Sequence, residues 1–215
     1  MNRPLKQKQT IATKATHVLC LGNSITFHPY RPEIGWLSEH GMAASRPERD
    51  YCHLLEQWLK EHDAESTVTG INIADYEVNF RRSFRRIIGK HIDGKDTIIV
   101  RIGENVRNTK CFAWALRRLV RWCMRKANRV IICGCVWKDE SKEHALKATA
   151  EQYGLPFVEL DWIMSEHPET YPKVGDELID RDRNPYRIEK DFIITHPNDI
   201  GMRMIAEAIY KKIKP

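Results

Sequence analysis

A serine, an asparagine and a histidine in this sequence each stand where α/β proteins commonly carry chemistry. Ser24 follows an apolar run, residues 17–21, and Asn105 follows a second apolar run, residues 97–102. His196 directly precedes a segment with helical periodicity. A serine hydroxyl becomes a nucleophile when a base accepts its proton, and histidine is the usual base near neutral pH. An amide N–H can stabilise the oxyanion that forms during acyl transfer. Together these residues predict nucleophilic acyl chemistry, provided that the fold brings them together.

Each of these residues also has an ordinary structural explanation. Serine and asparagine are frequent after strands, so Ser24 alone is typical of a turn or a helix cap, and Asn105 of a turn. Among the other histidines, His40 and His53 are the alternatives to His196 that lie nearest the same edge of the predicted sheet. The argument for chemistry therefore depends on the three positions as a set.

Short apolar runs alternate with amphipathic segments along the chain, which is typical of βαβ units and a parallel sheet. The predicted strands are residues 17–21, 67–74, 97–102, 129–136 and 157–160, and the predicted helices are residues 50–62, 75–91, 111–126, 141–153 and 198–212. This pattern predicts an α/β fold, a three-layer α/β/α sandwich of flavodoxin-like type with about five parallel strands. A length of 215 residues favours one domain, residues 1–215, with residues 1–14 as a disordered basic N-terminus.

Ligands of open α/β sheets bind beyond the carboxyl ends of the strands, where Ser24 and Asn105 are expected. Residues 28–49 form a long connection at the same edge, and connections of that length are usually functional. Trp36 lies within this segment. We expect it either to form a platform for a sugar ring or to pack inside the loop.

Three short blocks of the sequence resemble the signatures of the SGNH hydrolase superfamily, the GDSL-like esterases and lipases. Residues 22–24, Gly-Asn-Ser, resemble the block that carries the nucleophile, and residues 103–105, Gly-Glu-Asn, resemble the block with an oxyanion-hole asparagine. The His-Pro pair at His196 resembles the block with the general base. The blocks occur in the family's order and span nearly the whole chain. The resemblance implies the flavodoxin-like fold, with Ser24 as nucleophile and Asn105 as oxyanion donor.

The activity that this resemblance implies is hydrolysis of a small acyl ester, with acetyl groups on a carbohydrate as the leading substrate. Asn23, Gly103, Glu104 and Trp36 are the expected substrate-binding residues, and neither a metal nor an organic cofactor is implied. An acyltransferase that uses the same serine, and a non-catalytic binder of an anionic polymer, are the alternatives. A phosphate or nucleotide binder is disfavoured because residues 22–24 are not part of a glycine-rich phosphate loop.

The sequence departs from the family signature in three places. Asn23 replaces the aspartate that usually precedes the nucleophile, and Ile193 stands where the acid that orients the histidine is expected. Residues 72–77 lack the glycine expected after the second strand. Without an acid at position 193, either a backbone carbonyl orients the imidazole, giving a Ser-His dyad, or a remote acid such as Glu104 does so. We favour the dyad.

The formal net charge of +6 is concentrated in two arginine-rich segments, residues 81–86 and 117–129. A solvated helix face is the ordinary explanation of such clusters. The alternative is attraction to an anionic partner such as an acidic polysaccharide, a membrane surface or nucleic acid. We expect no nucleic-acid partner, because no nucleic-acid-binding motif is present. The expected partner is a small-molecule or carbohydrate ester substrate, and the oligomeric state is open.

Six cysteines show no Cys-x-x-Cys pair and no zinc-type spacing with histidine. Buried, reduced thiols are therefore expected, with Cys133 and Cys135 on one face of a strand. No apolar run is long enough for a membrane span, and residues 1–14 lack the apolar core of a signal peptide. Cytoplasmic location is the default expectation, although a chain trimmed of an export signal would look the same.

Overall fold

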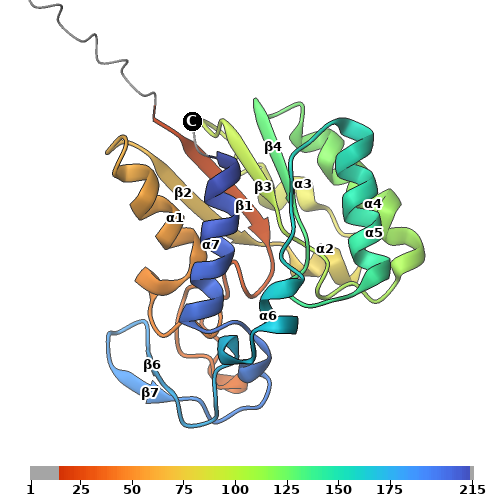
Figure 1. Cartoon of the computed structure of the whole chain (residues 1–215). Coiled ribbons are helices and arrows are strands. Elements are labelled where there is room, and N and C mark those ends of the chain that lie inside the picture. Colours follow the sequence, from red (N-terminus) through yellow and green to blue (C-terminus); the bar gives the residue numbers. More distant parts are fainter. Residues whose placement is uncertain (1–14, 214–215) are drawn as a thin grey trace, which may run out of the picture.

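The central element of the molecule is a five-stranded parallel sheet, seen in a computed structural model that describes residues 15–213 (Figure 1). Its strands are β1 (His17–Gly22), β2 (Thr67–Asn72), β3 (Thr97–Val100), β4 (Arg129–Cys133) and β5 (Phe157–Val158). All neighbouring strands pair in parallel, in the order β2-β1-β3-β4-β5. This is the flavodoxin-like order, in which successive strands are added first on one side of β1 and then, from β3 on, on its other side. The predicted fold class is confirmed.

Alternating residues of each strand face two different helical layers. Leu19 and Leu21 of β1 pack on one side, and Val18 and Cys20 pack on the other. The first layer contains α2 (Ala74–Val78), α3 (Phe84–Ile88), α4 (Thr109–Cys123) and α5 (Glu140–Tyr153). The second layer contains α1 (Tyr51–Lys60), α6 (Trp162–Glu166) and α7 (Asp199–Ile213). Because period-two burial places apolar residues on both sheet faces, the result is a three-layer sandwich.

Local capping residues set the ends of two predicted helices. The Asp50 carboxylate accepts a hydrogen bond from the backbone N–H of His53 at 2.8 Å, which caps the start of α1. Gly154 ends α5 in a left-handed conformation with φ 61°. Both boundaries follow from the residue types alone.

The predicted single helix over residues 75–91 is wrong, because the chain forms α2 and α3 with a break at residues 79–83. Tyr76 and Phe84 are both buried, and their ring centroids lie 5.0 Å apart. On one continuous helix these residues would be separated by about 12 Å along the axis. Burial of both rings in the same part of the core therefore requires the chain to fold back.

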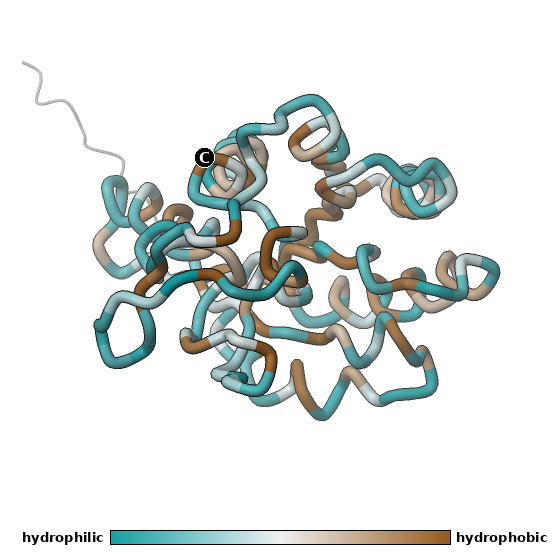
Figure 2. Tube along the Cα trace, turned by 90° about the horizontal axis from the view of Figure 1, so that it is seen from below, coloured by the Kyte–Doolittle hydropathy of each residue, from teal (hydrophilic) through white to brown (hydrophobic). Residues whose placement is uncertain are grey.

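The long segment of residues 28–49 lies below the sheet beside a small hairpin, β6 (Glu177–Ile179) and β7 (Pro185–Arg187), which the sequence did not predict (Figure 1). The Ser38 hydroxyl donates to the Ile179 carbonyl at 2.6 Å. The Asp199 carboxylate, at the start of α7, accepts hydrogen bonds from the backbone N–H and the hydroxyl of Ser45. The loop is thus tied to two distant segments of the chain. Viewed from below, hydrophobic stretches at this edge lie among mostly hydrophilic loops (Figure 2).

The cysteines are free thiols, and all except Cys111 are buried. Cys133 and Cys135 pack on opposite faces of the sheet, contrary to the expectation of a shared face. β4 ends at Cys133, so the period of two does not extend to Cys135. None of the helices formed by residues 15–213 is long and apolar enough to cross a membrane. The expected disordered N-terminus, residues 1–14, lies outside the described residues.

The buried face of α4 provides a direct test of this packing. Phe112 is fully buried and Trp114, two positions later, is 55% exposed. We expect Phe112→Ala to lower the free energy of unfolding by about 3–5 kcal/mol, because it leaves a cavity in the core. Trp114→Ala is the matched control and is expected to cost less than about 1 kcal/mol. Urea unfolding monitored by circular dichroism measures both, and equal losses would contradict the assigned faces.

Candidate active site

Ser24 lies in a tight turn directly after β1. Gly22 must be glycine here, because a Cβ at this position would lie 1.9 Å from the Thr26 hydroxyl oxygen. The Asn23 carbonyl accepts hydrogen bonds from the backbone N–H groups of Thr26 and Phe27, at 2.9 and 3.0 Å. The turn leaves Ser24 half-buried at the carboxyl edge of the sheet, where ligands of this fold class bind.

The fold brings Ser24 and His196 together from opposite ends of the chain. The Ser24 Oγ and the His196 Nε2 are 2.7 Å apart. His196 follows a short 3-10 turn, Ile193–Thr195, and lies just before α7. A nucleophile and a base in hydrogen-bond contact are the core of a serine-based acyl-transfer site.

The second ring nitrogen of His196 faces a backbone carbonyl. The distance from Nδ1 to the Phe192 carbonyl oxygen is 3.2 Å, and the Thr195 hydroxyl is 3.3 Å away. A carbonyl oxygen can only accept, so this contact requires the hydrogen on Nδ1 and leaves the Nε2 lone pair directed at Ser24. The geometry is that of a Ser-His dyad oriented by the main chain.

Ile193 is fully buried, where the family signature would place an acid. It packs in a small apolar cluster whose other buried members are Trp36, Met42, Ala43, Leu178 and Ile188. A carboxylate at this position would have to be buried among these apolar side chains, which is unfavourable. The isoleucine that replaces the acid therefore suits its apolar surroundings.

Burial lowers the pKa of His196 to about 4, because the imidazolium form is poorly solvated in the protein interior. The hydrogen bond to the Phe192 carbonyl opposes this shift, and the nearby His28 adds to it. The imidazole is therefore neutral, and able to accept a proton, over the whole range above about pH 5.

A buried guanidinium organises the residues around Ser24. Arg101, just past the end of β3, is fully buried and donates to the Glu104 carboxylate at 2.5 Å and to the Asn23 side-chain oxygen at 2.6 Å. The Asn23 amide nitrogen in turn donates to Glu104 at 2.7 Å. Asn23 and Glu104 thus face this cluster rather than a substrate, which corrects their expected substrate-binding role. Glu104 also does not orient His196.

A second buried carboxylate, Glu77 of α2, holds the turn of residues 103–105. It accepts hydrogen bonds from the backbone N–H of Gly103 at 2.5 Å and from the Asn105 side-chain amide at 2.9 Å. Burial, with a further contribution from the nearby Glu104, raises the pKa of Glu77 to about 7. Since the Gly103 N–H is bound by Glu77, Gly103 does not serve as a substrate-binding residue.

Gly103 itself is required by the backbone and by a close neighbour. Its φ is +147°, and a Cβ at this position would lie 2.5 Å from the Cys135 sulfur. The sharp turn that it permits directs the half-buried Asn105 toward Glu77. An amide nitrogen carries two hydrogens, so Asn105 has one left for a ligand after binding Glu77.

The segment that lacks the expected glycine, residues 72–77, supplies no replacement donor at Ile73 or Ala74. The backbone N–H of Ile73 donates to the Gly22 carbonyl at 2.7 Å. The backbone N–H of Ala74 donates to the Asn72 side chain at 2.8 Å. Both groups are therefore bound within the protein.

Trp36 is fully buried, so the expected sugar platform is wrong and the packing alternative holds. Its indole N–H donates to the His28 carbonyl at 3.2 Å, and its ring packs edge-to-face against His40. Large aromatic side chains are stabilised by such burial when the N–H finds an acceptor. Trp36 anchors the loop rather than a ligand.

His40 and His53, the alternatives to His196 as the base, each form a contact with another group. His53 Nδ1 lies 2.9 Å from the Asp50 carboxylate, and the buried His40 Nδ1 lies 3.0 Å from the Gly41 carbonyl. Within residues 15–213, no group of three or more His, Cys, Asp or Glu side chains is arranged to hold a metal ion.

Two side chains at this edge were missed by sequence reasoning: Glu77 and Arg101. Arg101 interrupts an otherwise apolar strand, and a charge in a buried strand is a usable signal for a buried ion pair. Glu77 lies in the segment with the missing glycine, but nothing in its sequence context marks it. A backbone carbonyl was the favoured partner of His196, and the structure has that of Phe192 in this place, a residue that the sequence did not single out.

Solved structures with this fold include several esterases. No protein-family model and no curated protein matches the sequence. An α/β hydrolase from the metagenome of Lake Arreo, Spain, has a TM-score of 0.61 at 15% identity, over 94% of this chain and 96% of that one. The acetylxylan esterase of Geobacillus stearothermophilus has a TM-score of 0.55 at 15% identity, over 95% of this chain and 96% of that one.

A two-domain esterase active on acetylated mannans has a TM-score of 0.59 at 20% identity. The match covers 92% of this chain and 48% of that one, so this chain spans about half of the two-domain protein. At these identities, the three likenesses show a shared fold.

The Arg101 cluster yields a stability prediction. We expect Arg101→Leu to lower the free energy of unfolding by about 3–5 kcal/mol, because it leaves the buried Glu104 without its cation. Arg203, which forms an exposed ion pair with Glu207 at 2.9 Å, is the matched control. Arg203→Leu is expected to cost less than about 1 kcal/mol. Chemical denaturation compares the two, and a small loss in Arg101→Leu would contradict the organising role of Arg101.

Proposed function

We propose that this protein is a serine esterase that hydrolyses small acyl esters, with acetyl groups on a carbohydrate as its substrates. The observation that carries the proposal is the 2.7 Å contact between the Ser24 Oγ and the His196 Nε2. The resemblance of residues 22–24, 103–105 and 196–197 to the SGNH signatures supports the same assignment. Structures with the same fold include esterases whose names specify acetylxylan and acetylated mannans, which supports the choice of substrate.

In the first half of the proposed reaction, the Ser24 Oγ attacks the ester carbonyl carbon while its proton passes to His196 Nε2. The carbonyl oxygen becomes an oxyanion, held by the Ser24 backbone N–H and by the free hydrogen of the Asn105 amide. One such donor is typically worth about 3 kcal/mol in the transition state. His196 then returns the proton to the alcohol oxygen as the ester C–O bond breaks. An acyl group remains on Ser24.

In the second half, His196 accepts a proton from water as the water oxygen attacks the acyl carbon. The tetrahedral intermediate collapses, the proton moves to the Ser24 Oγ, and a carboxylic acid leaves. Microscopic reversibility gives His196 the base and acid roles in turn.

The Phe192 carbonyl has a specific part in this cycle. It keeps the hydrogen on Nδ1 and stabilises the imidazolium that forms when His196 accepts a proton. A carbonyl dipole stabilises that cation less than a carboxylate does, which agrees with the lowered pKa of His196. Glu77 is a positioning residue in the same scheme, because it fixes the Asn105 amide.

Substitution of the dyad tests the proposal directly. We expect Ser24→Ala and His196→Ala each to lower kcat for an aryl acetate by about a thousandfold or more, because either change removes the activated nucleophile. The exposed residues Ser83 and His91 provide the matched controls Ser83→Ala and His91→Ala, which are expected to retain activity. Equal rates in all five proteins would show that Ser24 and His196 are not a catalytic pair.

The lowered pKa of His196 predicts an unusual pH profile. The base must be neutral, so kcat/KM for an aryl acetate is expected to rise through about pH 4 and to reach its plateau well below pH 6.5. Glu77, with a pKa of about 7, also titrates within the pH range of this profile. A histidine titration by NMR in Ser24→Ala therefore measures the pKa of His196 apart from that of Glu77. A His196 pKa at or above 6.5 would contradict the assignment.

Linkage gives the same shift a stability signature. The unfolded state binds a proton at His196 near pH 6.5, whereas the folded state binds it only near pH 4. The contribution of His196 to the free energy of unfolding is therefore fully present above pH 6.5 and is lost as the pH falls toward 4.

A further inference from the structure

The excess of positive charge in this protein is concentrated in two stretches of the chain. Residues 78–92 and 105–138 together contain 14 Lys and Arg and no Asp or Glu. The remaining residues contain 21 Lys and Arg against 29 Asp and Glu, so the rest of the chain is net acidic. Most of these basic residues lie in or beside α3 and α4, in the helical layer formed by α2, α3, α4 and α5. The molecule thus has one strongly cationic layer.

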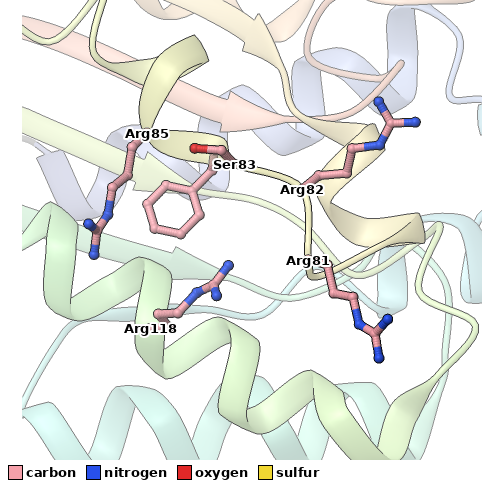
Figure 3. A pocket seen from close by; sticks show the side chains of 6 residues that line it. Arg81, Arg82, Ser83, Arg85 and Arg118 are labelled. Atoms are coloured by element: carbon pink, nitrogen blue, oxygen red, sulfur yellow. The ribbon is translucent and has the colours of Figure 1, made fainter.

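Two adjacent hollows on this layer are lined mainly by arginines. The first, of about 270 Å³, is lined by Arg81, Arg82, Ser83, Phe84, Arg85 and Arg118 (Figure 3). The second, of about 430 Å³, is lined by Arg85, Trp114, Arg117, Arg118, Arg121, Arg125, Gln152 and Tyr153. Arg85 and Arg118 line both, which makes them parts of one groove. No carboxylate of the described residues lines either hollow, and the Arg82–Asp75 pair is long at 3.7 Å.

Helical spacing produces one side of this arginine groove. Lys110, Trp114, Arg117 with Arg118, Arg121 and Arg125 recur every three or four residues along and just beyond α4, so they share one face. The 15 residues of α4 span about 22 Å. The stripe begins at Lys110, five residues after Asn105 in the sequence, and continues to Arg125.

Arg118 fixes the middle of the groove. It extends from α4 toward the 81–85 segment (Figure 3), donates to the Phe80 carbonyl at 2.9 Å and lies 5.0 Å from the centre of the Trp114 ring. Its Nε is buried and has no hydrogen-bond partner in the described part of the molecule. Trp114 is 55% exposed, although exposure of so large an aromatic ring is unfavourable. A flat apolar ring among fixed cations suits a ligand with both an apolar face and negative charges.

We propose that the arginine groove binds an anionic polysaccharide, and that the substrate of this protein is an acetylated acidic glycan. The inference rests on the proposed esterase function. A pyranose ring presents an apolar C–H face to Trp114, and its carboxylate, sulfate or phosphate groups pair with the arginines. A chain anchored along α4 would place an acetylated residue at the Ser24 edge.

The shape of the groove favours this partner over two others. A bilayer surface is flat and is best met by protruding apolar side chains, whereas these cations line a concave groove. Duplex DNA is held by phosphate contacts spread over a wide surface, whereas the stripe on α4 is a single line of basic residues. A single extended polymer chain fits both the concave groove and the single line.

Binding measured apart from catalysis tests the proposal. The probe is polygalacturonate, with neutral xylan, duplex DNA and phosphatidylserine vesicles as comparisons, and Ser24→Ala is the protein. We expect Ser24→Ala to bind polygalacturonate, with an affinity that falls as salt rises, and to bind xylan weakly. Adding Arg121→Glu and Arg125→Glu is expected to weaken binding about tenfold or more, because both cations lie in the groove.

A charge-matched control separates the groove from net charge. Lys211→Glu with Lys212→Glu makes the same change in charge on the exposed end of α7 and is expected to leave binding intact. Circular dichroism and thermal unfolding show whether each variant is folded. Equal loss in both double variants, or tighter binding to DNA or vesicles than to polygalacturonate, would overturn the proposal.

The outcome is independent of the proposed catalysis. Loss of aryl acetate hydrolysis in the wild type would contradict the esterase function while leaving polygalacturonate binding measurable. Conversely, full aryl acetate activity without polygalacturonate binding would contradict the acidic substrate and leave the esterase function standing.

Discussion

The buried charge of Arg101 is the constraint on which the candidate active site depends. A guanidinium with no exposure to water is tolerated only when carboxylates and polar oxygens surround it. Glu104 and the Asn23 side chain meet that requirement, and each lies beside a residue of the proposed reaction. The turn after β1 and the turn after β3 are thereby fixed relative to each other. Glu77 extends this arrangement to Asn105.

The site has two halves built by different physical means. The side formed by β1, β3 and α2 is a network of charged and amide groups that hold one another at hydrogen-bond distance. The side that carries His196 is apolar, with Ile193 in a cluster that joins the 28–49 segment to the β6–β7 hairpin. This apolar setting explains why a main-chain carbonyl, and not an acid, faces His196 Nδ1. It also explains the lowered pKa of the imidazole.

The carboxylates near Ser24 and the arginines of the arginine groove belong to different parts of the molecule and have different partners. The carboxylates near the site, Glu104 and Glu77, are paired with Arg101 and with backbone and amide donors, so they offer little attraction to a distant cation. The arginines of α3 and α4 face outward into the arginine groove. An anionic polymer would therefore be attracted along α4 and not repelled at the Ser24 edge, since Glu104 is neutralised by its ion pair.

The sequence by itself determined the fold class, the five strands of the central sheet and the placement of Ser24 and Asn105 after strands and of His196 before a helix, because period-two burial and strand-ending turns are local properties. It also indicated the caps Asp50 and Gly154, whose effects act within one helical turn. Only the tertiary structure decided the rest. The break between α2 and α3, the burial of Trp36 and the pairing of Cys133 and Cys135 with opposite layers each depend on contacts between distant segments.

The roles of Asn23, Gly103 and Glu104 show the same limit most clearly. Their residue types suit a substrate site, and the sequence places them at the correct edge. Whether a polar side chain at that edge faces a ligand or a buried guanidinium depends on where Arg101 and Glu77 lie in three dimensions. Hydrogen bonds between residues 26 to 81 positions apart make that choice, and no local pattern encodes them.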